Sequence, residues 1–182
     1  MSTTNVRHAM TVDTRVCVGC KACVLACKGE NAVPDGSSRA WVVEEVRGTY
    51  PALAMEIRSE RCNHCTDAPC VKACPTGASH VAEGGTVLVT HSKCSGCKAC
   101  IAACPYDARF VHPGGYVDKC TFCAHRTEKG LAPACAGVCP TGALTFGDRN
   151  DVTSEVARLL RTRRWKVLHP EAGTEPNVFF LE

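Results

Sequence analysis

The sequence predicts an α+β fold in which short helices and small strands are joined by loops around several bound metal groups. Three observations support this prediction. Of the 182 residues, 16 are cysteine, far more than an ordinary globular chain carries. Aromatic residues make up 5% of the chain, so the aromatic core is thin. The cysteines also fall into four groups of four whose flanks repeat along the chain, so we expect metal ligation to support the fold.

The four groups use two spacings. The first and third follow C-x2-C-x2-C-x3-C, whereas the second and fourth lengthen the middle gap to four and eleven residues. In chain order the groups are Cys17, Cys20, Cys23 and Cys27; Cys62, Cys65, Cys70 and Cys74; Cys94, Cys97, Cys100 and Cys104; and Cys120, Cys123, Cys135 and Cys139. The flanks "CVGCKACVLACK" and "CSGCKACIAACP" match the first group to the third, and "CPTGAS" and "CPTGAL" match the second to the fourth. Proline follows the last cysteine in three groups, and Lys28 takes its place in the first.

The spacing of the first and third groups is typical of bacterial ferredoxins. Three cysteines at two-residue gaps reach three irons of one cubane, and the fourth begins a segment that ligates the neighbouring cluster. Tetrahedral zinc needs two CxxC pairs, so the third cysteine of these groups would be superfluous for zinc. A disulfide scaffold would fit a secretory signal peptide, which we do not expect in the polar stretch 1–11. The pattern therefore favours four [4Fe–4S] clusters.

The segments between the groups predict small elements. Short helices are expected over 21–33 and 98–108, each carrying the last cysteine of its group. Strands are expected over 41–46, 52–58, 86–90 and 165–170, the first two joined by a turn at Gly48 and Pro51. An amphipathic helix is expected over 154–164. Its apolar positions are Val156, Leu159 and Leu160, and Asp151 or Thr153 is its expected cap.

Composition also argues against two classes of protein. No apolar run approaches the roughly 18 residues of a spanning helix, so we expect no transmembrane segment. The net charge is +3 and no long basic run is present, which argues against a nucleic-acid partner.

Beyond the cysteine motifs themselves, the chain resembles the four-cluster iron–sulfur (beta) subunits of molybdopterin oxidoreductases of the DMSO reductase family. It looks most similar to the polysulfide reductase B chain and its thiosulfate, tetrathionate and arsenate relatives. The matching segments are "CVGCKACVLACKGEN", "CPTGAS", "CIAACPYDAR", "HPGGYVDKCTFCAHR", "CPTGALTFGD" and "LHPEAGTEPNVFFL". The resemblance covers nearly the whole chain, and it is specific for the type of subunit rather than for the substrate.

The resemblance implies two nested, pseudo-symmetric bacterial-ferredoxin-like dicluster modules with loop-rich connections. The outer module would comprise 1–34 and 105–150, the inner module 52–104, and 151–182 would form a C-terminal helix and docking tail. Four ligand sets follow by carry-over: Cys17, Cys20, Cys23 and Cys139; Cys27, Cys120, Cys123 and Cys135; Cys74, Cys94, Cys97 and Cys100; and Cys62, Cys65, Cys70 and Cys104. Some relatives replace one cysteine of the third group by tryptophan and hold a three-iron cluster. Because Cys97 is present here, we expect four complete [4Fe–4S] clusters.

The function implied is that of an electron-transfer subunit in anaerobic respiration, with no catalytic residues and no enzyme activity of its own. The first ligand set would face a molybdenum- or tungsten-bis-pterin catalytic subunit, and the set of Cys62 would face a polytopic, quinone-binding membrane anchor. The expected location is membrane-associated through these partners on the extracytoplasmic face after co-export, with the cytoplasmic face as the alternative. The alternative function is a polyferredoxin-type subunit of a hydrogenase or formate-linked complex.

Several side chains near the cysteines leave two interpretations open. His64 and His125 either donate hydrogen bonds to clusters or pack without a special role. Lys21 and Lys98 occupy equivalent positions in the repeat. They either raise cluster potentials by their charge or are simply solvated.

Other side chains raise the question of a partner surface. We expect Arg109, Arg126 and Lys129 to be exposed, with contact to an acidic partner as the alternative. The adjacent Phe179 and Phe180 of the tail predict either core or interface, and we favour an interface.

Overall fold

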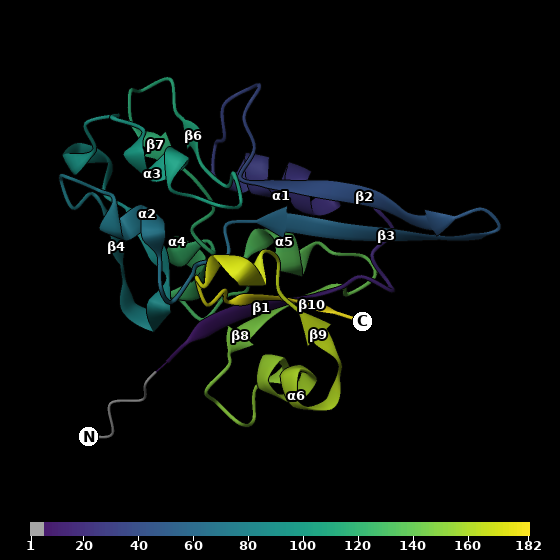
Figure 1. The fold of residues 1–182 in the computed structure, drawn as a ribbon. Helices are drawn as coiled ribbons and strands as arrows, with labels where there is room; N and C mark the ends of the chain where they lie inside the picture. The colour runs from purple at the N-terminus through teal and green to yellow at the C-terminus, as the bar shows by residue number, and fades with distance from the viewer. Residues whose placement is uncertain (1–5) are drawn as a thin grey trace.

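The computed structural model describes residues 6–182, so the first five residues of the polar N-terminal stretch lie outside the described part. Within the described residues, four small sheets and several short helices make up the fold (Figure 1). The four-stranded sheet lies below the centre of Figure 1 with a helix beneath it, and a long hairpin projects to the right. The small strands β4, β6 and β7 and the helices α2 and α3 gather at the upper left, and α1, α4 and α5 lie near the centre. The α+β class predicted from the sequence is therefore present.

The four-stranded sheet brings distant parts of the chain together. Its order is β8-β1-β10-β9. The bounds are Leu144–Asp148 for β8, His8–Asp13 for β1, Val178–Leu181 for β10 and Trp165–Lys166 for β9. The strands β1 and β10 pair in parallel, with Met10 opposite Val178, and the other pairs are antiparallel. The predicted strand over 165–170 is thus present but shorter.

The apolar tail is part of the core. Phe180 is 1% exposed and packs in the main hydrophobic cluster, and Phe179 packs with Ala9 and Val156 in a second cluster. The expectation that these phenylalanines form an interface is therefore wrong. They are buried because β10 is an inner strand whose two faces are both covered, one by the main cluster and the other by the second cluster.

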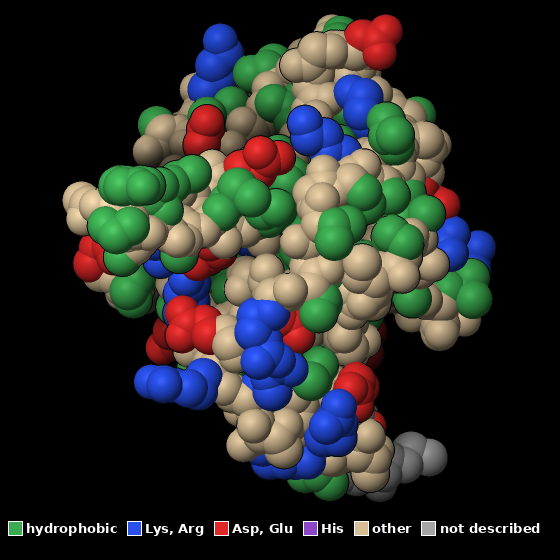
Figure 2. Space-filling view, turned by 90° about the vertical axis from the view of Figure 1, so that its right-hand side faces the viewer, with side chains coloured by type: hydrophobic (Ala, Val, Ile, Leu, Met, Phe, Trp, Pro, Cys, Tyr) green, Lys and Arg blue, Asp and Glu red, His purple; other side chains and the backbone are tan. Residues whose placement is uncertain are grey.

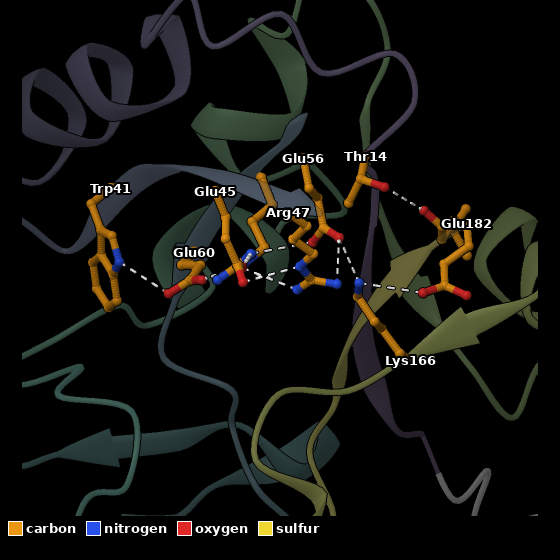
Figure 3. Close-up of polar contacts among 10 residues, drawn as sticks. Thr14, Trp41, Glu45, Arg47, Glu56, Glu60, Lys166 and Glu182 are labelled. Atoms are coloured by element: carbon orange, nitrogen blue, oxygen red, sulfur yellow. Dashed lines mark hydrogen bonds and ion pairs between the residues drawn. The ribbon is translucent and has the colours of Figure 1, made fainter. Parts of the chain in front are cut away.

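The strands β2 (Ala40–Thr49) and β3 (Ala52–Arg61) form the long hairpin, which confirms and extends the strands predicted over 41–46 and 52–58. Residues opposite one another share a face in an antiparallel pair. One face carries a network of ion pairs, drawn in Figure 3, in which Lys166 of β9 bonds Glu56 at 2.6 Å. On the opposite face the pairs Val42–Ser59 and Ala40–Arg61 turn toward the cysteines.

Short helices follow the cysteine loops. Their bounds are Ala22–Glu30 for α1, Pro69–Lys72 for α2, Ala99–Ala102 for α3, Ala124–Thr127 for α4 and Ala134–Gly137 for α5. The helix predicted over 98–108 ends early, before Cys104, because the residue preceding Pro105 is disfavoured in the helical region. The first group has Lys28 where the others have proline, and α1 continues through Cys27 to Glu30. Pairwise, α1 packs against α5 and α2 against α3.

The predicted amphipathic helix is α6 (Glu155–Thr162), which packs with its buried Val156 under the four-stranded sheet. Its cap is Ser154 and not Asp151 or Thr153, since the Ser154 hydroxyl accepts from the Ala157 amide at 3.1 Å. The Asp151 carboxylate instead accepts from the amide and hydroxyl of Thr153.

Two further hairpins and three 3-10 helices complete the described chain. The bounds are Ser79–Val81 for β4, Val87–Val89 for β5, Phe110–Val111 for β6, Val117–Asp118 for β7, Glu83–Gly85 for η1, His91–Lys93 for η2 and Pro170–Ala172 for η3. The strand β5 confirms the prediction over 86–90. Across residues 6–182, no helix has both the length and the apolar character needed to cross a membrane.

Candidate metal centres

The sequence repeat of the cysteine groups is also a repeat of backbone conformation. Gly19 and Gly96 both have φ of +67°, a left-handed conformation that glycine adopts without strain. The following lysines of the first and third groups are left-handed as well, and each begins its helix. Gly77 and Gly142, in the two "CPTGA" segments, both have φ of +65°. Matching segments therefore present their thiols through matching loops.

The first gathering of thiols brings Cys139, the last cysteine of the fourth group, beside the first three cysteines of the first group. Burial and the neighbouring thiols of Cys23, Cys139 and Cys20 raise the pKa of Cys17. The same four cysteines line one small cavity with Gly19 and Pro140. Cys139 is therefore beside the first group, although it follows the fourth group in sequence.

The second gathering places Cys27 beside the rest of the fourth group. Burial and the thiols of Cys135 and Cys123 raise the pKa of Cys27 to about 11. Burial, Cys27 and Cys135 raise the pKa of Cys120 still further. The Asn31 amide nitrogen lies 3.7 Å from Cys27 Sγ and 3.8 Å from Cys123 Sγ, so it can donate to both sulfurs.

The second group gathers with Cys104 of the third. Burial raises the pKa of Cys65 to about 11, an effect to which the thiols of Cys62, Cys70 and Cys104 add. Burial likewise raises the pKa of Cys70, with Cys62 and Cys104 contributing. Cys104 therefore stands beside the second group.

For the remaining cysteines the structure gives hydrogen bonds to the sulfurs. Cys94 Sγ accepts from the Val117 amide at 3.4 Å, and Cys74 Sγ accepts from the Ser79 amide at 3.3 Å. Cys100 lies on α3, which packs against α2 just before Cys74. Cys97 is exposed at the surface.

Two cysteines lie in loops that favour the thiolate. Burial raises the pKa of Cys74, but hydrogen bonds from Ser79, Thr76 and Ala78 outweigh it and lower the pKa overall. Burial raises the pKa of Cys139 too, and bonds from its own "CPTGA" loop and the adjoining residue again lower it. Because metal binds the thiolate and not the thiol, these loops are prepared for ligation.

Three cations are buried among the thiols. Arg61, Arg109 and Lys119 are 2%, 4% and 1% exposed, so the expectation that Arg109 is exposed is wrong. Arg61 Nη1 donates to Cys135 Sγ at 3.1 Å, and Arg109 Nη2 donates to Cys70 Sγ at 2.8 Å. Within the described residues, Arg61 Nε and Arg109 Nε and Nη1 have no hydrogen-bond partner.

Such burial is costly unless an anion compensates the charge. Thiolate-bound iron–sulfur clusters are anionic and accept hydrogen bonds at their sulfurs, so the residues present fit such clusters. The sequence reasoning did not single out Arg61 or Lys119. The sequence contains one weak indication of their role, since each directly precedes the first cysteine of a group.

His64 is packed in the core, and its Nε2 is buried without a hydrogen-bond partner among the described residues, so a donor role toward a bound cluster stays a prediction. It is fully buried, stacks on Phe122 with ring centroids 3.7 Å apart, and its Nδ1 accepts from the Val87 amide at 3.1 Å. Burial first, and then the nearby Lys119 and Arg109, lower its pKa well below the usual value, so the ring is neutral.

The other side chains whose role the sequence left undecided lie at the surface. His125 and Arg126 are both paired with Glu30 of α1, at 2.8 Å and 2.9 Å. Lys21, Lys98 and Lys129 are exposed.

Comparison with known proteins defines the class first. Two family models, each described as a 4Fe–4S dicluster domain, match residues 53–149 and 16–78. The chain is therefore a ferredoxin-like protein with two dicluster domains, and together with its sixteen cysteines this gives four [4Fe–4S] clusters.

Several relatives then define the family. The chain is 44% identical to the tetrathionate reductase B subunit of Salmonella typhimurium, over 96% of this chain and 72% of the relative. It is 41% identical to the polysulfide reductase B chain of Wolinella succinogenes, over 96% and 94%, and 35% identical to the arsenate respiratory reductase iron–sulfur subunit of a Shewanella species, over 96% of each. The protein belongs to this family of iron–sulfur electron-transfer subunits of reductases, as its motifs predicted.

Proposed function

We propose that this subunit relays single electrons between a quinone-handling membrane anchor and a molybdenum- or tungsten-bis-pterin catalytic subunit. The reductase would be of the polysulfide, thiosulfate, tetrathionate or arsenate type. The chain itself would hold and insulate the carriers, and the substrate chemistry would lie on the partner. One-electron transfer is the chemistry that [4Fe–4S] clusters supply when bound. The observation that carries the proposal is the arrangement of the cysteines: Cys20 and Cys97 are exposed, whereas the first three cysteines of the second and fourth groups are buried.

We assign the four ligand sets as the exchange pattern predicts. For convenience each set is named by one member: the Cys20 set is Cys17, Cys20, Cys23 and Cys139; the Cys120 set is Cys27, Cys120, Cys123 and Cys135; the Cys62 set is Cys62, Cys65, Cys70 and Cys104; the Cys97 set is Cys74, Cys94, Cys97 and Cys100. The electrostatic contacts among thiols support the first three sets. The packing of α2 on α3 supports the last.

The buried cations support a linear order of these sets. Arg61 interacts with Cys135 and Cys23, which joins the Cys20 and Cys120 sets. Lys119 interacts with Cys62 and Cys120, and Arg109 with Cys70 and Cys100. The proposed order is therefore the Cys20, Cys120, Cys62 and Cys97 sets. It differs from the order implied by resemblance, in which the Cys62 set was the one facing the anchor, and it puts the Cys97 set there instead.

We propose two nested modules, as the resemblance implies, with one change to the bounds of the outer module. The packing of α1 on α5 supports an outer module from 1–34 and 105–150, and that of α2 on α3 supports an inner module within 52–104. Because β9 and β10 share a sheet with β1 and β8, we assign 151–182 to the outer module. A docking role for this tail is not retained.

The Cys20 end offers a surface for the catalytic subunit. The distal half of the hairpin carries exposed Val46, Leu53 and Met55 on the strand face that, nearer its base, turns toward the cysteines. Figure 2 shows this end of the molecule, with hydrophobic side chains across its middle and basic side chains below. We propose that the catalytic subunit covers this apolar region, and that membrane association on the extracytoplasmic face arises through the partners.

The test is anaerobic purification of the native complex with its partners. We expect a pterin-containing large subunit, and four iron and four sulfide ions for each of four clusters in this chain. A nickel–iron subunit in place of the pterin subunit would contradict the proposed partner. Zinc without iron and sulfide would contradict the clusters themselves.

A further inference from the structure

The three buried cations alternate with the proposed ligand sets. Buried lysine and arginine are rare in folded proteins unless they are paired, because removing a charge from water is costly. Among the carboxylates of the described residues, none forms a salt bridge with Arg61, Arg109 or Lys119. The nearby thiols are the groups of opposite charge that these cations meet when the ligands are deprotonated.

Arg61 connects two sets through one serine. Its Nη1 donates to Cys135 Sγ at 3.1 Å, and its Nη2 donates to the Ser59 hydroxyl. That hydroxyl lies 3.3 Å from Cys23 Sγ. The guanidinium therefore reaches a sulfur of the Cys120 set directly and a sulfur of the Cys20 set through Ser59.

Arg109 repeats this arrangement in the other half of the molecule. Its Nη2 donates to Cys70 Sγ at 2.8 Å and to the Ser79 hydroxyl at 3.0 Å. The Ser79 amide donates to Cys74 Sγ at 3.3 Å. A second arginine and a second serine thus connect the Cys62 set to the Cys97 set.

Lys119 lies between the two middle sets. Its ammonium donates to the carbonyls of Val87 and Cys120, which hold it in place. Burial lowers its pKa, and the thiols of Cys62 and Cys70 of one set and of Cys120 of the other act against this lowering by stabilising the ammonium. Each of the three cations therefore has a neighbouring set on both sides.

We propose that Arg61, Lys119 and Arg109 are fixed charges, each of which raises the redox potentials of the two clusters on either side of it. The inference rests on the ligand sets proposed above. A reduced cluster carries one more negative charge than an oxidised one, so a nearby cation stabilises the reduced form. Inside the protein this attraction is several-fold stronger than in water and is little screened by salt. A shared cation also offsets the repulsion between electrons on neighbouring clusters.

The exposed lysines provide the contrast. Lys21 and Lys98 follow directly after Cys20 and Cys97 in sequence, but both are exposed. Solvent and salt screen such charges. We therefore expect Lys21 and Lys98 to have little effect on the cluster potentials, although each is next to a ligand in sequence. Lys119 is buried between two ligand sets, so we expect it to have a large effect.

The experiment is an EPR-monitored redox titration of the anaerobically purified full chain carrying Lys119→Met. This change removes the charge and keeps an unbranched side chain. We expect the clusters of the Cys120 and Cys62 sets each to shift to lower potential by at least about 59 mV, a tenfold change in the ratio of reduced to oxidised cluster. The two end clusters should shift less. Signals are assigned with the Cys20→Ser and Cys97→Ser variants.

Lys98→Met is the matched control and should leave all four potentials nearly unchanged. Unchanged potentials in Lys119→Met, or equal shifts of all four clusters, would overturn the proposal. Iron and sulfide analysis of the unmodified chain separates this outcome from failure of the proposed function, because that function requires four clusters at the outset.

Two further variants keep the proposal testable if Lys119→Met loses iron. Arg61→Gln should lower the potentials of the Cys20 and Cys120 sets, and Arg109→Gln those of the Cys62 and Cys97 sets. A shift confined to one cluster in either variant contradicts the idea of a shared charge. Loss of iron in all three variants would mean that the cations serve assembly alone, and the proposal would be rejected.

Discussion

The two kinds of cysteine group differ in where they place their thiols. In the compact first and third groups the second cysteine, Cys20 or Cys97, is exposed. In the lengthened second and fourth groups all of the first three cysteines are buried: Cys62, Cys65, Cys70, Cys120, Cys123 and Cys135. The compact loops thus lie at the surface, and the lengthened loops lie inside.

The added residues show how the burial arises. The four-residue gap of the second group bonds to the tail, since the Thr66 and Asp67 amides donate to the carbonyls of Glu175 and Thr174. The eleven-residue gap of the fourth group contains α4, whose Arg126 pairs with Glu30 of α1. In both cases the added residues attach the loop to a distant segment of the chain. In the proposed order of the ligand sets, the lengthened groups supply most ligands of the two middle clusters and the compact groups most ligands of the two end clusters.

The largest expected effect comes from removing one thiolate from each region. Cys120→Ser removes a thiolate that faces buried Arg61, and breaking a buried charge pair costs roughly 3–5 kcal/mol. We expect loss of the Cys120 cluster and a large drop in the free energy of unfolding, measured by iron analysis and anaerobic denaturation. Cys20→Ser, at the exposed end, should affect only its own cluster. Equal destabilisation by the two changes would remove the distinction between middle and end.

The pairing between groups gives the next prediction. Cys139→Ser should alter the EPR signal of the Cys20 cluster, because Cys139 lies with Cys17 and Cys20. A change confined to the cluster of the other three cysteines in the fourth group would show that the exchange is wrong.

The cover over the second group can be tested at Asn177. Its buried side-chain amide donates to the His64 carbonyl at 2.7 Å. Asn177→Ala leaves this carbonyl without that donor, which should cost about 1–3 kcal/mol in denaturant unfolding of the holoprotein. The exposed Glu171→Ala serves as the control. If Asn177→Ala costs no more than this control, the tail does not stabilise the buried loop.

The smallest effect is expected away from all the cysteine loops. Ser154→Ala removes the cap of α6 and should lower the free energy of unfolding by about 1 kcal/mol. Because α6 packs under the four-stranded sheet, the four EPR signals should stay unchanged. Thr153→Ala, which leaves the cap in place, is the matched variant. Altered cluster signals would show that the sheet and the clusters are more closely coupled than their packing indicates.

Local pattern predicted much of this molecule. The cysteine groups, the hairpin and α6 are each indicated within a few residues, through spacing or periodicity. Local pattern did not indicate the burial of Phe180, because this burial depends on pairing between β1 and β10, which lie at opposite ends of the described chain. The burial of Arg109 likewise depends on sulfurs brought together by separate loops, so the residue type alone indicated exposure.

The parallel pairing of β1 with β10 has a consequence for the order of events during synthesis. The strand β10 lies far along the chain from β1, so the four-stranded sheet cannot close around β1 until that distant segment has been synthesised. The cysteines of the first group therefore emerge before the sheet that adjoins them is complete.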